Sequence, residues 1–171
     1  MVSIIRAKPD DNELLCSIGK KTFIESHGPS ASEKDIFEYL ENNYTPDIFK
    51  KQLSDNLNIF NIIYYKEQPA GYSKIRFNES HKEIELLNIT KMERLYLLKD
   101  FYNLKLGYNL FQFNLNLALQ NEQKGMWLFV WKDNKRAVDF YKKAGFEIIG
   151  DHDFKLTESH KNPNYLMLLD F

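Results

Sequence analysis

Two spacings of apolar residues alternate along the chain and predict its order of strands and helices. Short apolar runs rich in branched and aromatic residues are typical of strands, and apolar residues three or four positions apart are typical of helices. Strands are predicted at residues 2–6, 59–65, 70–77, 84–98, 127–131, 146–153 and 164–171, and helices from Asp10 or Asp11, Ser32, Thr45, Leu104 and Asn134. This order predicts a mixed α/β fold, in which a six- to seven-stranded, mostly antiparallel sheet is flanked by helices and contains one parallel βα crossover.

The segment from Trp127 to Phe146 carries the clearest local signals. Its first residues, Trp127–Trp131, are apolar and aromatic between polar neighbours, as in a buried strand. Asn134 can accept hydrogen bonds from the free amides of a first helical turn, and Gly145 supplies the left-handed residue that ends a helix. Between them, apolar residues recur at helical spacing at Ala137, Phe140, Tyr141 and Ala144. A strand, a capped helix and a second strand therefore follow one another here.

The helix predicted at Leu104–Gln120 is apolar around much of its circumference, so we expect it to be buried. The loop before it, Tyr102–Gly107, contains a glycine at which backbone can approach a ligand closely. A helix N-terminus has unpaired N–H groups and a partial positive charge, which together suit a diphosphate. An ordinary capped helix is the alternative interpretation of this loop.

Composition narrows the classes of function. The 23 basic and 24 acidic residues nearly balance, so no nucleic-acid partner is expected. No apolar run reaches the length of a membrane span and the first residues lack the order of a signal peptide, so no membrane partner is expected either. Cys16 is the only cysteine, which suits a cytoplasmic protein, and we expect a buried thiol there, not a nucleophile. The scattered histidines form no metal-ligand cluster.

Three segments carry a resemblance to a known family. They are Glu93-Arg94-Leu95-Tyr96-Leu97, Tyr102-Asn103-Leu104-Lys105-Leu106-Gly107, and the pattern Asn-x-x-Ala-x-x-Phe-Tyr-x-x-x-Gly-Phe from Asn134 to Phe146. Together they resemble the GCN5-related N-acetyltransferase (GNAT) superfamily. Further strings, Thr22-Phe23, Trp127-Leu128-x-Val130-Trp131, Gly150-x-His152-x-Phe154 and Leu166-Met167, are most similar to bacterial PaiA-type polyamine N-acetyltransferases. The resemblance implies a single GNAT acetyltransferase domain over residues 1–171.

This resemblance implies acetyl-CoA as the cosubstrate and no metal. The implied cofactor-binding residues are Leu95, Tyr96, Leu97, Tyr102, Asn103, Leu104, Lys105, Leu106, Gly107, Tyr108, Asn134 and Tyr141. Two of them depart from the family, since Tyr102 stands where relatives have Gln or Arg, and Lys105 where they have Gly. Lys105 must therefore tolerate the loop dihedrals or accept strain, and its ammonium group can offset strain by pairing with a phosphate.

Tyr141 and Glu93 are the catalytic residues that the resemblance implies. Tyr141 can protonate the leaving thiolate as the tetrahedral intermediate collapses, unless it is only a core residue beside Phe140. Glu93 can take the proton that the substrate amine must lose, directly or through water, unless it serves only in a salt bridge. Strand alternation predicts Glu93 and Leu95 on one face of their strand and Arg94 on the other.

The expected acceptor is a small-molecule primary amine, and a polyamine such as spermidine is preferred. Acidic residues in the first two helices, which wall the acceptor site in GNAT folds, would attract a polycation, although a solvated helix face also explains them. These residues are Glu25, Glu33, Asp35, Glu38 and Glu41. The alternatives are a peptide, protein or small-metabolite N-acetyltransferase, a CoA-binding module without turnover, and an interaction domain that binds no CoA. The sequence leaves open whether the chain forms a homodimer.

Overall fold

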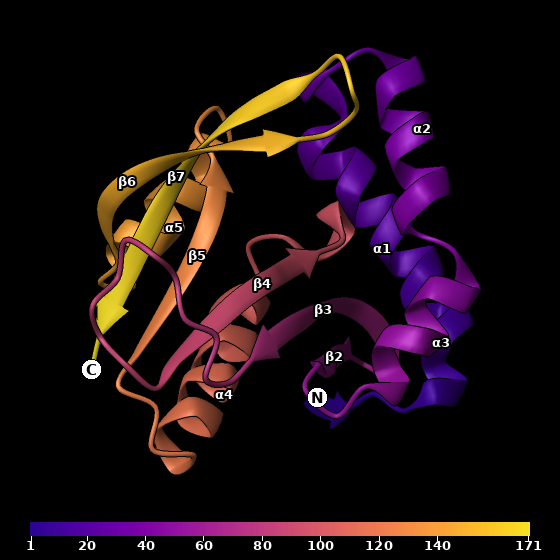
Figure 1. Cartoon of the computed structure of the whole chain (residues 1–171). Helices are drawn as coiled ribbons and strands as arrows, with labels where there is room; N and C mark the ends of the chain where they lie inside the picture. Colours follow the sequence, from indigo (N-terminus) through magenta and orange to yellow (C-terminus); the bar gives the residue numbers. More distant parts are fainter.

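In the computed structural model, which describes residues 1–171, helices flank both faces of a seven-stranded sheet (Figure 1). The strands are β1 Val2–Arg6, β2 Ile59–Tyr65, β3 Gln68–Arg76, β4 Ile89–Leu97, β5 Gly125–Trp131, β6 Glu147–Lys155 and β7 Lys161–Asp170, and the α-helices are α1 Asn12–His27, α2 Glu33–Asn43, α3 Pro46–Ser54, α4 Leu106–Gln120 and α5 Lys135–Lys143. The sheet order is β1-β2-β3-β4-β5-β7-β6, in which only β4 and β5 are parallel. The predicted mixed α/β fold is confirmed.

Left-handed residues set two boundaries that differ from the prediction. β4 begins at Ile89 and not at residue 84, because Asn88 directly before it has a φ of 54°. α4 begins at Leu106 and not at residue 104, because Lys105 has a φ of 58°. Residues with a Cβ rarely adopt such values, and neither a strand nor a right-handed helix can continue through them.

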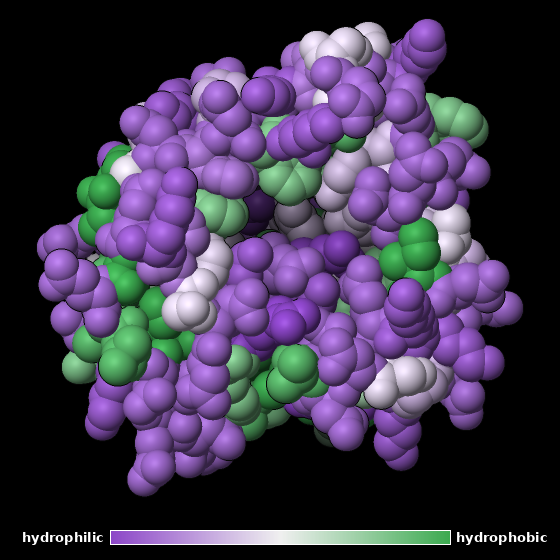
Figure 2. All heavy atoms as spheres, in the orientation of Figure 1, coloured by the Kyte–Doolittle hydropathy of each residue, from purple (hydrophilic) through white to green (hydrophobic).

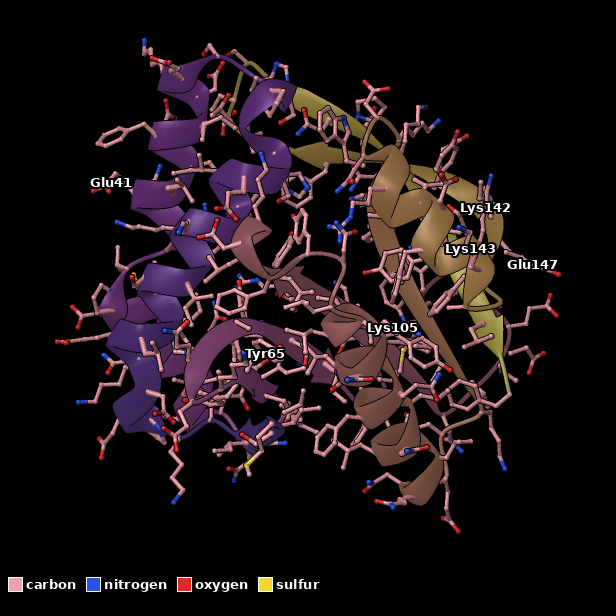
Figure 3. All side chains as sticks on the ribbon, turned by 180° about the vertical axis from the view of Figure 1, so that it is seen from behind. Glu41, Tyr65, Lys105, Lys142, Lys143 and Glu147 are labelled. Atoms are coloured by element: carbon pink, nitrogen blue, oxygen red, sulfur yellow. The ribbon has the colours of Figure 1, made fainter.

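Different helices cover the two faces of the sheet, as Figures 1 and 3 show from opposite sides. Tyr96 of β4 packs into the apolar cluster that contains residues of α1, α2 and α3. Its neighbours Leu95 and Leu97 point to the other face and pack beside Leu106 of α4. On that same face, Val138 of α5 packs into the cluster beneath β5. None of the helices is both long and apolar enough to cross a membrane.

The sheet splits at its centre, between β4 and β5. The two strands pair at only three positions, the last of which joins Lys91 to Trp127. Beyond that pair β4 continues to Leu97 and β5 to Trp131, and the two strands diverge (Figure 1). The facing edges of both strands therefore carry backbone groups that have no strand beside them.

A buried polar layer fixes α4 against the sheet. Asn114 lies in the middle of this helix and is fully buried. Its Oδ1 accepts a hydrogen bond from Asn61 Nδ2 at 3.0 Å, and its Nδ2 donates to Ser73 Oγ at 2.9 Å and to the Leu110 carbonyl at 2.8 Å. Because a buried amide is costly to leave unpaired, this layer favours one rotation and one height of α4 on the sheet.

Candidate active site

The gap between β4 and β5 opens into a cavity of about 750 Å³, a volume typical of small-molecule sites. On the α1–α3 face its walls are largely aromatic and include Phe23, Tyr39, Tyr96, Trp131 and Phe154. On the α4–α5 face the walls include Gly107, Asn134 and Tyr141. Figure 2 shows the hollow near the centre of the face that Figure 1 presents. The split sheet thus joins two half-sites that lie on opposite faces of the protein core.

The first turn of α4 forms one wall of the cavity. Gly107 lines it, and the nearest atom to a Cβ added there would be Leu97 Cδ1, at 3.4 Å. The amide of Asn109 donates to the Lys105 carbonyl, and no side chain caps the helix. The N–H groups before Asn109 are therefore free. Free amides at a positive helix end bind anions, so the residues present fit the diphosphate of a CoA thioester.

Lys105 precedes this turn in a left-handed conformation, with φ 58° and ψ 12°. Figure 3 shows it at the start of α4, and its side chain is exposed. The loop dihedrals are thus adopted by a residue for which they cost about 1–2 kcal/mol. Asn103, two positions earlier, is also left-handed, with a φ of 65°. Lys105 therefore holds a left-handed position that glycine would adopt without a steric cost, and the loop carries local strain there.

The predicted cofactor-binding residues divide into two groups. Those that line the cavity are Leu95, Tyr96, Leu97, Tyr102, Gly107, Asn134 and Tyr141. Those that do not are Asn103, Leu104, Lys105, Leu106 and Tyr108. Leu106 is only 1% exposed and belongs to the core, whereas the other four are exposed beside Tyr102 and Gly107.

An arginine of α5 brings a positive charge to the loop. The guanidinium carbon of Arg136 lies 3.4 Å from the centroid of the Tyr102 ring, and both residues line the cavity. Tyr102 itself supplies no charge, but Arg136 stacks on its face and stays beside the loop. Sequence periodicity gives no signal for this contact, because the two residues belong to different elements that meet only in the folded chain.

Two residues of the Asn134–Phe146 pattern reach the cavity from α5. Asn134 Oδ1 accepts the amide of Ala137 at 3.2 Å, which confirms the predicted N-cap, and the residue also lines the cavity. Tyr141 is 8% exposed, packs against Phe140 and Phe146, and still lines the cavity. Burial raises the pKa of its phenol, which therefore stays protonated near neutral pH.

A β-bulge changes the facing of residues in the centre of β4. The register with β3 shifts next to Lys74, which pairs with Arg94, and Glu93 is the extra residue. Glu93 therefore shares a face with Arg94, and Leu95 points to the opposite face. The alternation expected from the sequence is wrong at this point, because a bulge adds a residue that a period of two does not count.

The bulge brings Glu93 to Lys74. Their Oε1 and Nζ atoms are 2.8 Å apart, with side-chain exposures of 28% and 6%. Burial alone would raise the pKa of Glu93, but the positive charges of Lys74 and Arg94 outweigh it and hold the pKa below its usual value. Glu93 also lines the cavity. The salt bridge that the sequence left as an alternative is present, and it keeps an ionised carboxylate at the cavity wall.

His27 lines the cavity although no sequence pattern singled it out. α1 extends to this residue, and its ring stacks on Phe23 at 4.7 Å and on Trp131 at 5.9 Å between centroids. Its Nδ1 is 2.7 Å from Ser26 Oγ. Burial lowers the pKa of His27 to about 4, so the imidazole is neutral near pH 7. The acceptor-side wall therefore gains a neutral ring from the last turn of α1.

The acidic residues of the first two helices are mostly remote from the cavity. Only Glu25 lines it, and its carboxylate accepts the Lys99 amide at 2.8 Å. Asp35 accepts a hydrogen bond from the Thr157 hydroxyl group, and Glu41 points outward from α2 in Figure 3. The cluster expected to attract a polycation is therefore mainly a solvated helix face.

Other reactive side chains do not form a second centre. Cys16 is 5% exposed and its Sγ donates to the Tyr44 carbonyl at 3.2 Å, so the expected buried thiol is confirmed. No group of three or more His, Cys, Asp or Glu side chains is arranged to hold a metal ion.

Comparison with known proteins assigns the chain to a family. The model of the Acetyltransferase (GNAT) family matches residues 25–146. An uncharacterised N-acetyltransferase of Lactobacillus delbrueckii subsp. lactis is 26% identical over 160 residues, which cover 94% of this chain and 92% of that protein.

Solved structures share the fold at lower identity. The PaiA N-acetyltransferase of Thermoplasma acidophilum, in complex with coenzyme A, superposes with a TM-score of 0.80 at 16% identity and covers 100% of this chain and 99% of that one. The ribosomal-protein-S18-alanine N-acetyltransferase of Escherichia coli gives a TM-score of 0.72 at 13% identity, with 99% and 94% covered. The chain belongs to the Acetyltransferase (GNAT) family, and it is an N-acetyltransferase with acetyl-CoA as its cosubstrate.

Proposed function

We propose that this enzyme, acting as one domain over residues 1–171, acetylates a primary amine of a small molecule at the split of its sheet. The cavity carries this proposal, because it brings Glu93 of β4, Tyr141 of α5 and the first turn of α4 to one space. Acetyl-CoA enters from the α4–α5 side and the amine from the α1–α3 side. The two reactants then meet at the edge of β4, where Leu95 and Leu97 line the cavity.

Backbone groups do most of the binding of the cosubstrate. The free amides of the first turn of α4, with Lys105 and Arg136 nearby, hold the diphosphate. The β4 edge that has lost its partner strand pairs with the pantetheine arm. Asn134 combines its helix cap with a contact to the same ligand, since its side chain has more hydrogen-bonding capacity than the cap uses.

Glu93 and Tyr141 handle the protons of the transfer. Glu93 draws the substrate ammonium to the cavity and takes its proton, directly or through water; its lowered pKa keeps the carboxylate ionised before the amine arrives. The neutral amine nitrogen then attacks the thioester carbon, while β4 amides near Leu95 and Leu97 polarise the carbonyl. The nitrogen loses its second proton to solvent as the tetrahedral intermediate forms, and Glu93 releases to solvent the proton that it took. As the carbon–sulfur bond breaks, Tyr141 donates its phenol proton to the leaving thiolate and is reprotonated from solvent. The products are an N-acetyl amine and CoA.

A polyamine such as spermidine is the acceptor predicted from the sequence, and the similarity in fold to a PaiA protein supports it. Glu25 and Glu93 are acidic residues at the cavity that support it further. Against it, the remaining acidic residues of the first two helices do not line the cavity. A primary amine on a small molecule is therefore the acceptor class that we propose, with spermidine as the first compound to test.

Free thiol release from acetyl-CoA across a panel of amines tests the activity, and thermal unfolding tests the cosubstrate. Acetyl-CoA at about 100 times its Kd should stabilise the folded chain by about 2.7 kcal/mol. We expect thiol release with at least one primary amine and none with the matching tertiary amine. An unchanged melting temperature at millimolar acetyl-CoA, together with no thiol release, would refute the proposal.

A further inference from the structure

A cluster of three charged residues on the α1–α3 face carries more positive than negative charge. Lys74 and Arg94, a cross-strand pair on the α1–α3 face, share one carboxylate, Glu93, and Lys74 holds it at 2.8 Å. Arg94 takes part in none of the ion pairs of the structure. A buried cation without a counter-ion is costly, and most proteins pair such a charge. The cluster of Lys74, Glu93 and Arg94 is thus one negative charge short.

Aromatic rings hold Arg94 in place without neutralising it. Its guanidinium carbon lies 4.8 Å from the centroid of Tyr44 and 5.5 Å from that of Phe49. Burial would lower its pKa, but neighbouring tyrosine hydroxyl groups and Glu93 outweigh this effect and raise the pKa above its usual value. The guanidinium group is therefore charged at every relevant pH. Rings that stack on a guanidinium leave its in-plane N–H donors free for another partner.

Two polar atoms in this cluster have no partner in the protein. Arg94 Nη1 and the Tyr72 hydroxyl group are buried and form no hydrogen bond. Arg94 itself lines the cavity and keeps part of its surface exposed there. The part of a fixed guanidinium group that remains accessible suits a carboxylate, which can accept two parallel hydrogen bonds from it.

We propose that Arg94 is a specificity-determining residue that binds a carboxylate of the acceptor, so that the preferred acceptors are amines that carry an anionic group. This inference rests on the proposed acetyl transfer at the same site. The acceptor carboxylate supplies the charge that this cluster lacks, and its amine reaches the β4 edge one residue further along the strand, at Leu95. A polycation would instead meet the unpaired charge of Arg94.

Matched acceptors test this inference. Linear ω-amino acids of three to six carbon atoms, the n-alkylamines and the α,ω-diamines of the same lengths differ only in the group at the far end. We expect the best ω-amino acid to exceed its alkylamine by about tenfold or more in kcat/KM, and its diamine by more, because a bidentate charge-assisted contact contributes at least this factor. Calorimetric titration of the CoA-bound protein with the same compounds measures the preference without turnover.

Variants assign the preference to one residue. Arg94→Met should reduce it to nearly one, mainly through KM, and Arg94→Lys should retain part of it because a charge without the planar fork remains. Arg76→Met is the matched control, since Arg76 also lies in the sheet but pairs with Glu79 and does not line the cavity. It should keep the full preference. If Arg94→Met does not fold, the acceptor preferences of Arg94→Lys and of the wild type still test the role of Arg94.

The outcomes separate this inference from the activity on which it rests. Thiol release with alkylamines or diamines at least as fast as with ω-amino acids would leave the acetyl transfer intact and overturn the role of Arg94. A preference for ω-amino acids that survives in Arg94→Met would overturn it too. So would a protein that binds CoA but neither binds nor acetylates any ω-amino acid. Absence of both CoA binding and thiol release would refute the proposed function instead.

Discussion

Replacing Lys105 by glycine should change stability and CoA affinity in opposite directions. The φ of 58° at Lys105 costs a residue with a Cβ about 1–2 kcal/mol, and the greater backbone entropy that glycine loses on folding offsets part of this. We expect a net gain of about 1 kcal/mol, which raises the Tm of a chain of this size by about 2–4 °C. The same change removes an ammonium group beside the free amides of α4. Loss of a charge-assisted phosphate contact of about 1.5–3 kcal/mol should weaken CoA binding by about 10- to 150-fold.

Scanning calorimetry and isothermal titration with CoA measure the two effects separately. The loss of affinity should be largest at low ionic strength, where the charge of the wild-type lysine is least screened. Lys66→Gly is the matched control, because Lys66 is left-handed, with a φ of 48°, in the turn between β2 and β3 and does not line the cavity. It should gain less stability, since its contact with the Tyr65 ring is lost, and bind CoA as the wild type does. Tighter CoA binding by Lys105→Gly would refute the phosphate contact.

Two further predictions concern the cavity walls. Tyr141→Phe should lower kcat by about a hundredfold and leave the Kd for CoA unchanged, because the phenol acts on charge that develops only as the thiolate leaves. An unchanged kcat in steady-state assays would restrict Tyr141 to a packing role. His27 has a folded-state pKa of about 4, below its unfolded value of about 6.5, so the unfolded chain binds its proton first. The contribution of neutral His27 to the free energy of unfolding should be complete above about pH 6.5 and fall by up to about 3 kcal/mol as the pH approaches 4. Urea unfolding at about pH 7 and pH 5 should show that His27→Phe loses less stability between these pH values than the wild type. Equal losses in the two proteins would contradict the assignment.

Local signals were sufficient to predict most of the elements. Helices follow Ser32, Thr45 and Asn134, as the sequence predicted, and each of these residues accepts an amide of the helix, because an N-cap depends only on residues within one turn. The GNAT patterns likewise indicated α4 and α5, and Gly107, Asn134 and Tyr141 from these patterns line the cavity. These features are encoded over a few consecutive residues, so a single sequence is enough to find them.

Features that depend on pairing between strands were not predictable in this way. The bulge at Glu93 follows from how β4 meets β3, and it placed Glu93 on the face of Arg94 instead of the face of Leu95. Asn114 occurs in an apolar helix pattern, and only its contacts with two strands explain its burial. The charge imbalance around Arg94 appears only once Lys74 is positioned across the sheet. Each is a relation between distant residues, and the periodicity of one segment carries no information about it.

The split between β4 and β5 also affects whether strands of two copies of this protein can pair with each other. An exposed strand edge is a template for pairing with another chain, and proteins usually blunt such edges with charges, prolines or short strands. Here the free edge that receives a ligand lies in the middle of the sheet, inside a cavity walled by helices on both sides. A slender, flexible ligand can thread into this space and add its hydrogen bonds, whereas a strand of another chain would have to pass between the helices to reach the same edge. The free backbone groups of the split are thus accessible to a ligand, while the surrounding helices hinder their pairing with a strand of another copy.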